Sequence, residues 1–163
     1  MQRLLIALAM FIGLFSAAAP AAEPQNWLRN NSFEQAARNL PAAWRTQTWN
    51  GQGTFEHATV GRTGKRSVSI SSERGGDLSW TSTIPVEPFA RYRLTGWIKT
   101  EDVKPSDGRG ALLNLHGIEG AQTRALVGTN DWTQVELTFT AQDQDSIQVN
   151  CLFGGFGLAT GRA

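Results

Sequence analysis

Residues 146–163 read SIQVNCLFGGFGLATGRA, and the first eight alternate in the manner of a β-strand. The side chains on one face of this strand would be those of Ile147, Val149, Cys151 and Phe153. The opposite face would carry Gln148, Asn150 and Leu152. A glycine-rich run follows. The pattern therefore predicts a strand with an apolar face for a core and a second face that presents carboxamides.

Similar alternation recurs in short segments that are separated by turn residues. The segments are Ser67–Ser71, Leu78–Val86, Arg91–Lys99, Ala111–Gly117, Thr133–Thr140 and, more weakly, Trp44–Trp49 and Gly53–Thr59. No helical period extends beyond two turns, and the nearest case, FEQAARNL at 33–40, is broken by Pro41. A chain of short alternating strands with 17 glycines predicts an all-β fold, an antiparallel β-sandwich in which each sheet buries one face.

The N-terminus has the features of a secretory signal peptide. Arg3 precedes an unbroken apolar run from Leu4 to Phe15, and the small residues SAAAPAA follow. The apolar run is shorter than the roughly 18 residues that a membrane-spanning helix needs. We expect residues 1–21 to be the signal peptide, with cleavage after Ala21 or Ala22. Residues 22–163 would then form one domain that is secreted or periplasmic.

Charge and cysteine content exclude several classes of partner. Without Arg3, 14 lysines and arginines balance 14 aspartates and glutamates. A chain without net charge or a basic stripe is a poor match for nucleic acid or for an anionic membrane. Cys151 is the only cysteine, so no internal disulfide is available, and its alternation with Val149 predicts a buried structural role.

The chain has six tryptophans in 163 residues, and large aromatic side chains pack in the core more often than they bind a ligand. Trp44 and Trp132 lie at expected strand entries, and Trp80 shares an apolar face with Leu78, so we expect these three to be structural. Trp49 and Trp97 lie among polar neighbours and are open to either role.

The sequence contains none of the common catalytic motifs. There is no G-x-S-x-G, H-E-x-x-H, P-loop or dinucleotide-binding fingerprint, and the two histidines are far apart in the chain. Several glutamates could supply a glycosidase carboxylate pair, but nothing in the sequence brings two of them together. We therefore expect a domain that is not an enzyme.

Several segments together resemble a known family. They are LRNNSFEQ, LPAAW, GRTGKRSVSI, ARYRLTGWIKTEDV, TNDWTQVELTFTA and VNCLFGGFGLATGRA. Their order and spacing are similar to those of CenC-like carbohydrate-binding modules, families four and nine, over nearly the whole expected mature chain. The resemblance implies a jelly-roll β-sandwich of the galactose-binding-domain-like kind, and such modules accompany secreted glycoside hydrolases.

In similar modules, the glycine-rich run leads into a last strand that pairs beside the first strand and closes a sheet. The sequence stops at Ala163, so we expect this C-terminal strand to be missing and the strand near Trp27–Glu34 to have an unpaired edge. The resemblance also implies a structural calcium ion near Glu34 and the turn that contains Lys65. The closing aspartate of that calcium site would lie on the missing strand, which would lower the affinity for calcium.

A sugar-binding surface needs an aromatic platform and planar groups that both donate and accept hydrogen bonds. Three predicted strands supply such side chains on their polar faces: Arg45, Gln47 and Trp49; Asn114 and His116; Gln148 and Asn150. If these strands share one sheet, the side chains would floor a shallow groove, with Trp49 as the stacking platform. Alternatively, they are ordinary solvated positions on the outside of a sandwich.

These observations predict a secreted, non-catalytic module that binds a neutral polysaccharide and targets an attached or associated enzyme. We expect a monomer, with an oligosaccharide or polysaccharide as the partner. Two alternatives stay open: an N-terminal piece of a larger exported glycoside hydrolase, and a structural sandwich in a surface or adhesion protein. The sequence does not identify the glycan.

Overall fold

A computed structural model of the chain describes residues 25–163. The signal peptide expected at residues 1–21 lies outside the described part. The strands are β1 (Ala36–Ala37), β2 (Leu40–Pro41), β3 (Arg45–Gly51), β4 (Thr54–Ala58), β5 (Ser67–Pro85), β6 (Arg91–Pro105), β7 (Gly110–His116), β8 (Gly128–Thr140), β9 (Ser146–Gly154) and β10 (Ala159–Arg162). Within residues 25–163 there is no helix long and apolar enough to cross a membrane.

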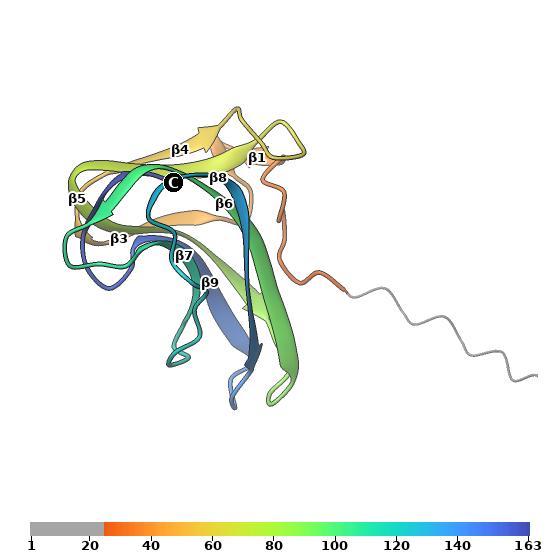
Figure 1. Cartoon of the computed structure of the whole chain (residues 1–163). Coiled ribbons are helices and arrows are strands. Elements are labelled where there is room, and N and C mark those ends of the chain that lie inside the picture. The colour runs from red at the N-terminus through yellow and green to blue at the C-terminus, as the bar shows by residue number, and fades with distance from the viewer. Residues whose placement is uncertain (1–24) are drawn as a thin grey trace, which may run out of the picture.

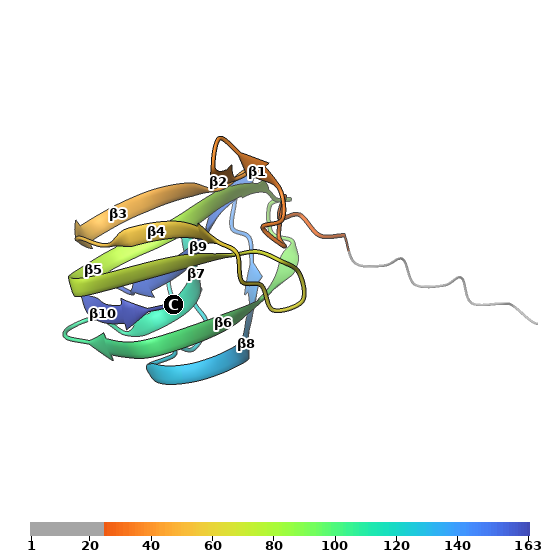
Figure 2. The ribbon, with the colours of Figure 1, turned by 90° about the horizontal axis from the view of Figure 1, so that it is seen from above.

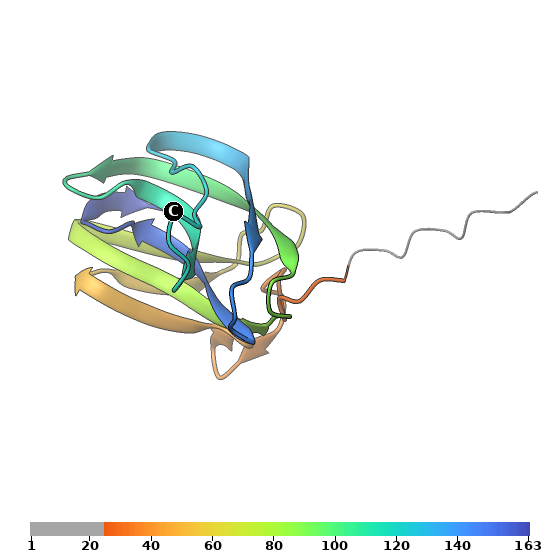
Figure 3. The same cartoon turned by 90° about the horizontal axis from the view of Figure 1, so that it is seen from below.

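The strands are antiparallel and form two layers that face each other, as Figure 1 shows. One layer contains β3, the C-terminal half of β5, β9 and β7 (Figure 3). The other layer contains β4, the N-terminal half of β5, β10, β6 and β8 (Figure 2). The predicted fold class, an all-β sandwich of the jelly-roll type, is confirmed.

Strand β5 belongs to both layers. The sequence predicts two strands here, with a turn at ERGGD, but the structure continues as one strand from Ser67 to Pro85. The bend lies at Gly75, whose φ of +101° is a conformation that side chains rarely adopt. The N–H of Gly75 donates to the hydroxyl of Ser72 at 3.0 Å, which fixes the bend locally. The predicted turn is therefore a kink that carries the strand from one sheet into the other.

The alternating residues meet between the layers and form two adjoining hydrophobic clusters. Leu78, Trp80 and Phe153 are fully buried, and the indole N–H of Trp80 donates to the carbonyl of Ser69. Trp44 is also buried, as predicted, whereas Trp132 is half-buried. Cys151 is half-buried and packs against both clusters, and desolvation of its thiol raises the pKa of that group to about 12. The thiol therefore has the structural role that the sequence predicts.

One prediction about the sheet edges is wrong, and one strand is not predicted by the sequence. Residues 27–34 form turns rather than a strand, and Trp27 and Leu28 pack on the core instead. The sequence also does not predict β10, which lies between β5 and β6. Ala163 continues this pairing through two backbone hydrogen bonds with Ile70.

An unpaired edge does exist, but on a different strand. The register of β10 with β6 covers Glu101–Pro105, whereas β8 pairs with β6 from Arg91 to Val103. On the side of β6 away from β8, no strand within residues 25–163 pairs with residues 91–100. Ile98 and Tyr92 on this stretch are half-buried.

Candidate functional site

The structure brings the three sequence-predicted groups onto one face of one sheet. Strands β3, β5, β9 and β7 are neighbours in that order, and residues opposite one another in the register share a face. One row across the sheet is Arg45, Thr81, Asn150 and Asn114, and the next includes Thr83, Gln148 and His116. A third row is Gln47, Ser79, Leu152 and Leu112. We call this surface the β3–β7 face.

Trp49 and His116 form a stacked pair, although they come from the two outer strands of this layer. Their ring centroids are 5.3 Å apart and the ring planes differ by 16°. The indole N–H of Trp49 also donates to the hydroxyl of Ser79 on β5 at 3.0 Å. Because β9 lies between β5 and β7, the two rings together extend over β9. Trp49 is 41% exposed, so part of its indole surface stays open to solvent.

A chain of carboxamides lies on β9 and β7. The amide nitrogen of Gln148 donates to Asn150 Oδ1 at 2.8 Å, and Asn150 Nδ2 donates to Asn114 Oδ1 at 3.0 Å. The hydrogen bonds run in one direction, so Gln148 keeps a free carbonyl oxygen and Asn114 keeps its amide nitrogen for other partners. The Gln148 end of the chain, which is half-buried, can therefore offer an acceptor, whereas Asn114 is buried.

The sequence predicts that both asparagines face water, and this is wrong. Asn150 is 1% exposed and Asn114 is 6% exposed, and each satisfies the other through the hydrogen bond above. Gln148 is half-buried, and Arg45, Gln47 and His116 are exposed. The asparagines therefore fix the floor of the face, and the exposed and half-buried residues are the ones that can contact a ligand.

Three hydroxyl residues of this face were not predicted as site residues. Ser79, Thr81 and Thr83 lie on β5 between the β3 and β9 groups. Their signal is present in the sequence, since Ser79 and Thr81 alternate with Leu78 and Trp80 along this segment. The layer order was not available from the sequence, so the row across β5 could not be recognised.

One end of the β3–β7 face is bounded by the loop between β9 and β10. Gly155 is buried, and its Cα lies so close to Leu112 that an added Cβ would clash with it. The Gly155 N–H donates to Asp77 Oδ1 at 3.3 Å. Burial raises the pKa of Asp77, while hydrogen bonds from the backbone of residues 155–157 oppose this shift. This loop is a further part of the face that the strand pattern does not predict.

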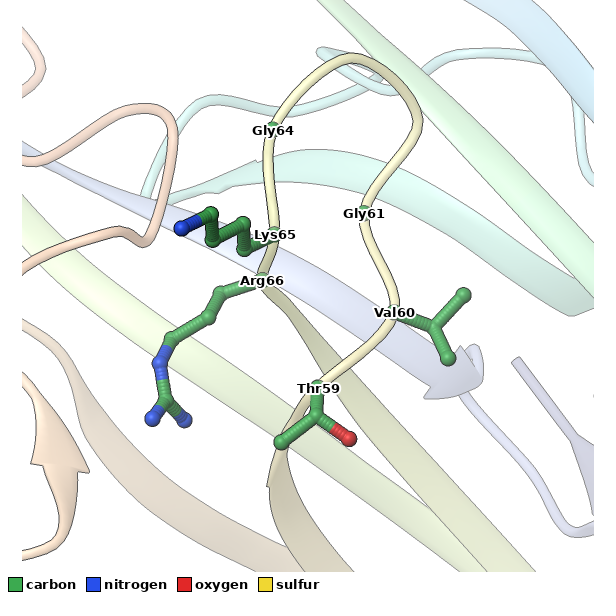
Figure 4. Close-up of a pocket in the computed structure, with 6 residues that line it drawn as sticks. All are labelled: Thr59, Val60, Gly61, Gly64, Lys65 and Arg66. Atoms are coloured by element: carbon green, nitrogen blue, oxygen red, sulfur yellow. The ribbon is translucent and has the colours of Figure 1, made fainter.

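Glu34 and Lys65, the predicted metal residues, do lie together. Glu34 Oε1 accepts hydrogen bonds from the backbone N–H groups of Lys65 and Arg66, at 2.9 and 3.0 Å. These contacts hold the loop between β4 and β5, which lines a shallow hollow (Figure 4). The side chains of Lys65 and Arg66 extend from one side of this loop, and Val60 extends from the other.

The arrangement at Glu34 fits calcium poorly. Lys65 presents an N–H to the carboxylate, where calcium would need an oxygen ligand. Residues 25–163 contain no cluster of three or more histidine, cysteine, aspartate or glutamate side chains. The carboxylate stabilises the loop without a metal, calcium at Glu34 stays a prediction, and no part of the proposed function depends on it.

Trp97, the other ambiguous tryptophan, lies on the opposite layer, in β6. It is 40% exposed, and the guanidinium carbon of Arg62 lies 3.5 Å from its ring centroid. The contact is a cation–π interaction. Trp97 therefore has the same exposure as Trp49, but it lies apart from the carboxamide chain.

The β3–β7 face defines a class of protein: a β-sandwich that offers an aromatic ring and fixed carboxamides on one sheet. The sequence model of the CBM_4_9 family, described as a carbohydrate binding domain, matches residues 25–151. The chain belongs to this family. None of the curated proteins matches the chain.

Two solved structures show the same fold. One is the enzymatically active domain of tailspike protein 4 from bacteriophage CBA120, with a TM-score of 0.57 and 15% identity. The match covers 82% of this chain and 20% of that one, so the chain spans about a fifth of that domain. The other is TmCBM61 in complex with β-1,4-galactotriose, with a TM-score of 0.53 and 15% identity. This second match covers 85% of this chain and 97% of TmCBM61.

Proposed function

We propose that the chain is a non-catalytic module that binds a neutral polysaccharide through the β3–β7 face. The observation that carries this proposal is that the stacked pair of Trp49 and His116 shares one sheet face with the Gln148–Asn150–Asn114 chain. The exposed surface of Trp49 offers a flat apolar surface to a pyranose ring. The free carbonyl oxygen of Gln148 and the hydroxyls of Thr81 and Thr83, which are half-buried or exposed, offer hydrogen-bonding groups to sugar hydroxyls.

Rigidity supports this role. A buried polar network that is fully satisfied holds its members in one arrangement. Asn150 and Asn114 are held in this way by their mutual hydrogen bond, and Ser79, which is fully buried, fixes the indole. A surface that is ordered before binding loses little conformational entropy when the ligand arrives.

The module would serve to hold an attached or associated enzyme, such as a glycoside hydrolase, close to its polysaccharide. We propose that it acts as a monomer and that the N-terminal segment directs it out of the cytoplasm, to the periplasm or beyond the cell. TmCBM61, which has the same fold, is a complex with a galacto-oligosaccharide, so β-1,4-galactan joins the candidate ligands.

The proposal is tested by affinity electrophoresis of residues 22–163 in gels that contain mixed-linkage β-glucan, xylan, mannan or β-1,4-galactan. Retardation by at least one polysaccharide is expected, with loss of retardation in Trp49→Ala. Trp97→Ala is the matched control, because Trp97 is 40% exposed where Trp49 is 41% exposed, and it should bind normally. If wild type migrates freely in all four gels, the proposed ligand class is wrong. If both tryptophan variants lose retardation equally, the proposed face is wrong.

A further inference from the structure

The loop between β9 and β10 presents an aromatic side chain at the rim of the β3–β7 face. Phe156 follows Gly155, which lies directly against Leu112 of that face. Phe156 is 63% exposed, although a ring of this size is normally buried at least in part. Its φ of +64° is uncommon and costly for a bulky residue.

Carboxylates on both sides of the loop hold this conformation. Asp77 accepts a hydrogen bond from the N–H of Gly155, and Asp107 Oδ1 accepts one from the N–H of Leu158 at 2.6 Å. The N–H of Arg109 donates to the carbonyl of Gly154 at 2.6 Å. The backbone on each side of Phe156 is therefore fixed, and the exposed ring is held in place rather than free to fold back onto the core.

Arg109 contacts the ring itself. Its guanidinium carbon lies 5.0 Å from the centroid of Phe156, within the range of a cation–π contact. The planar guanidinium restricts the orientation of the ring and leaves much of the ring surface exposed. The arrangement resembles that of Trp49 and His116, in which a second planar group also supports an exposed ring.

The two aromatic groups lie at different places along the same surface. Trp49 is bound to Ser79 on β5, and the loop lies against Leu112 on β7. Ser79 and Leu112 are in one row with Leu152 between them. Ser79 and Leu112, the residues that anchor the two groups, are thus two strand spacings apart, about 10 Å. One sugar ring stacked on Trp49 does not extend this far, but a chain of several sugars does.

We propose that Phe156, supported by Arg109, is a second stacking subsite that contacts a distal sugar of a bound oligosaccharide. This inference rests on the proposed function, since it assigns a further residue to the same binding face. It makes the site selective for chain length: short oligosaccharides contact Trp49 alone, and longer ones also contact Phe156.

The test uses calorimetry with oligosaccharides of two to six units prepared from each of the four polysaccharides named above. For wild type, affinity should rise with chain length. Phe156→Ala should weaken binding of the six-unit ligand by about five- to tenfold and leave two-unit binding unchanged. Phe156→Leu, which keeps an apolar side chain but no ring face, should show the same pattern, and Arg109→Ala should show a weaker form of it.

Phe89→Ala is the matched control. Phe89 is 73% exposed with φ of +62°, but it lies in the loop between β5 and β6. This variant should bind ligands of every length as wild type does. Thermal unfolding of each variant shows whether the fold is kept, and Phe156→Leu replaces Phe156→Ala if the latter unfolds.

The outcomes separate this inference from the proposed function. If Trp49→Ala abolishes binding while the Phe156 variants bind all lengths normally, the second subsite is wrong and the proposed function stands. An equal loss at all lengths also overturns the subsite, because it indicates a structural effect on the face as a whole. If wild type binds none of the oligosaccharides or polysaccharides, both are wrong.

Discussion

Replacement of Trp49 by alanine should weaken both ligand binding and folding. The change removes the stack on His116, worth about 0.5–1.5 kcal/mol. It also removes the hydrogen bond to the buried hydroxyl of Ser79, worth about 0.5–1.5 kcal/mol. The free energy of unfolding should therefore fall by about 1–3 kcal/mol, which lowers Tm by about 3–9 °C in a domain of this size.

The loss of the platform should lower glycan affinity by about 30-fold or more, since truncation of a central aromatic anchor commonly costs at least ~2 kcal/mol. Trp49→Phe keeps a ring above the face and loses the indole hydrogen bond. Its affinity should stay within about threefold of wild type. Comparison of Trp49→Phe with Trp49→Ala therefore separates the contribution of ring stacking from that of the hydrogen bond to Ser79.

Calorimetry with the best polysaccharide of the panel and thermal unfolding by circular dichroism give the two readouts. Binding should be measured well below the Tm of Trp49→Ala, where the variant is folded. A folded Trp49→Ala that binds within twofold of wild type would show that Trp49 is not the platform. An unchanged Tm would show that the contacts with His116 and Ser79 contribute nothing to stability.

Three further predictions concern the supports of the face and of the neighbouring loop. Asn150→Leu should lower the free energy of unfolding by about 1–3 kcal/mol in urea denaturation, because it leaves the carboxamide oxygen of Asn114 without its donor; an unchanged value contradicts this. Glu34→Ala should cost less, about 0.5–1.5 kcal/mol, because the two backbone N–H groups that lose their acceptor are exposed and can bind water instead. In wild type, a rise in Tm with added Ca²⁺ that is absent from Glu34→Ala would place calcium at this carboxylate, and no rise would exclude it there. The raised pKa of Asp77 means that its contribution to stability is full below pH 3.8 and is lost as the pH rises through the folded-state pKa. The difference in unfolding free energy between wild type and Asp77→Asn should therefore decrease with pH in this range, and a constant difference would contradict the shift.

The strand periodicity predicts the layers well because alternation reports directly which side chains are buried. Ile147, Val149 and Phe153 lie in the core, and Gln148 lies on the opposite face, as the pattern predicts. The pattern cannot show that ERGGD is a kink within β5, because glycines are typical of turns and of bent strands alike. It also misses β10, whose four residues, ATGR, include a glycine and carry no clear alternation.

The sequence predicts which side chains share the face of the candidate site, but not which of them are exposed to solvent. The alternation correctly places Asn114, Asn150 and Trp49 on one face once the strands are neighbours. Alternation shows which face a residue occupies, but not whether another side chain covers it. The stack of Trp49 on His116 joins residues that are 67 positions apart in the sequence. Only the order of the strands reveals such contacts.

Strand β5 hydrogen bonds with β4 and β10 along one part of its length, and with β3 and β9 along the other. Amide hydrogen exchange should therefore be slowest in β5, because this strand is paired on both of its edges along most of its length. The two sheets should lose their protection with the same opening free energy. A ligand on one layer would then slow exchange in the other, although no atom of the ligand touches it.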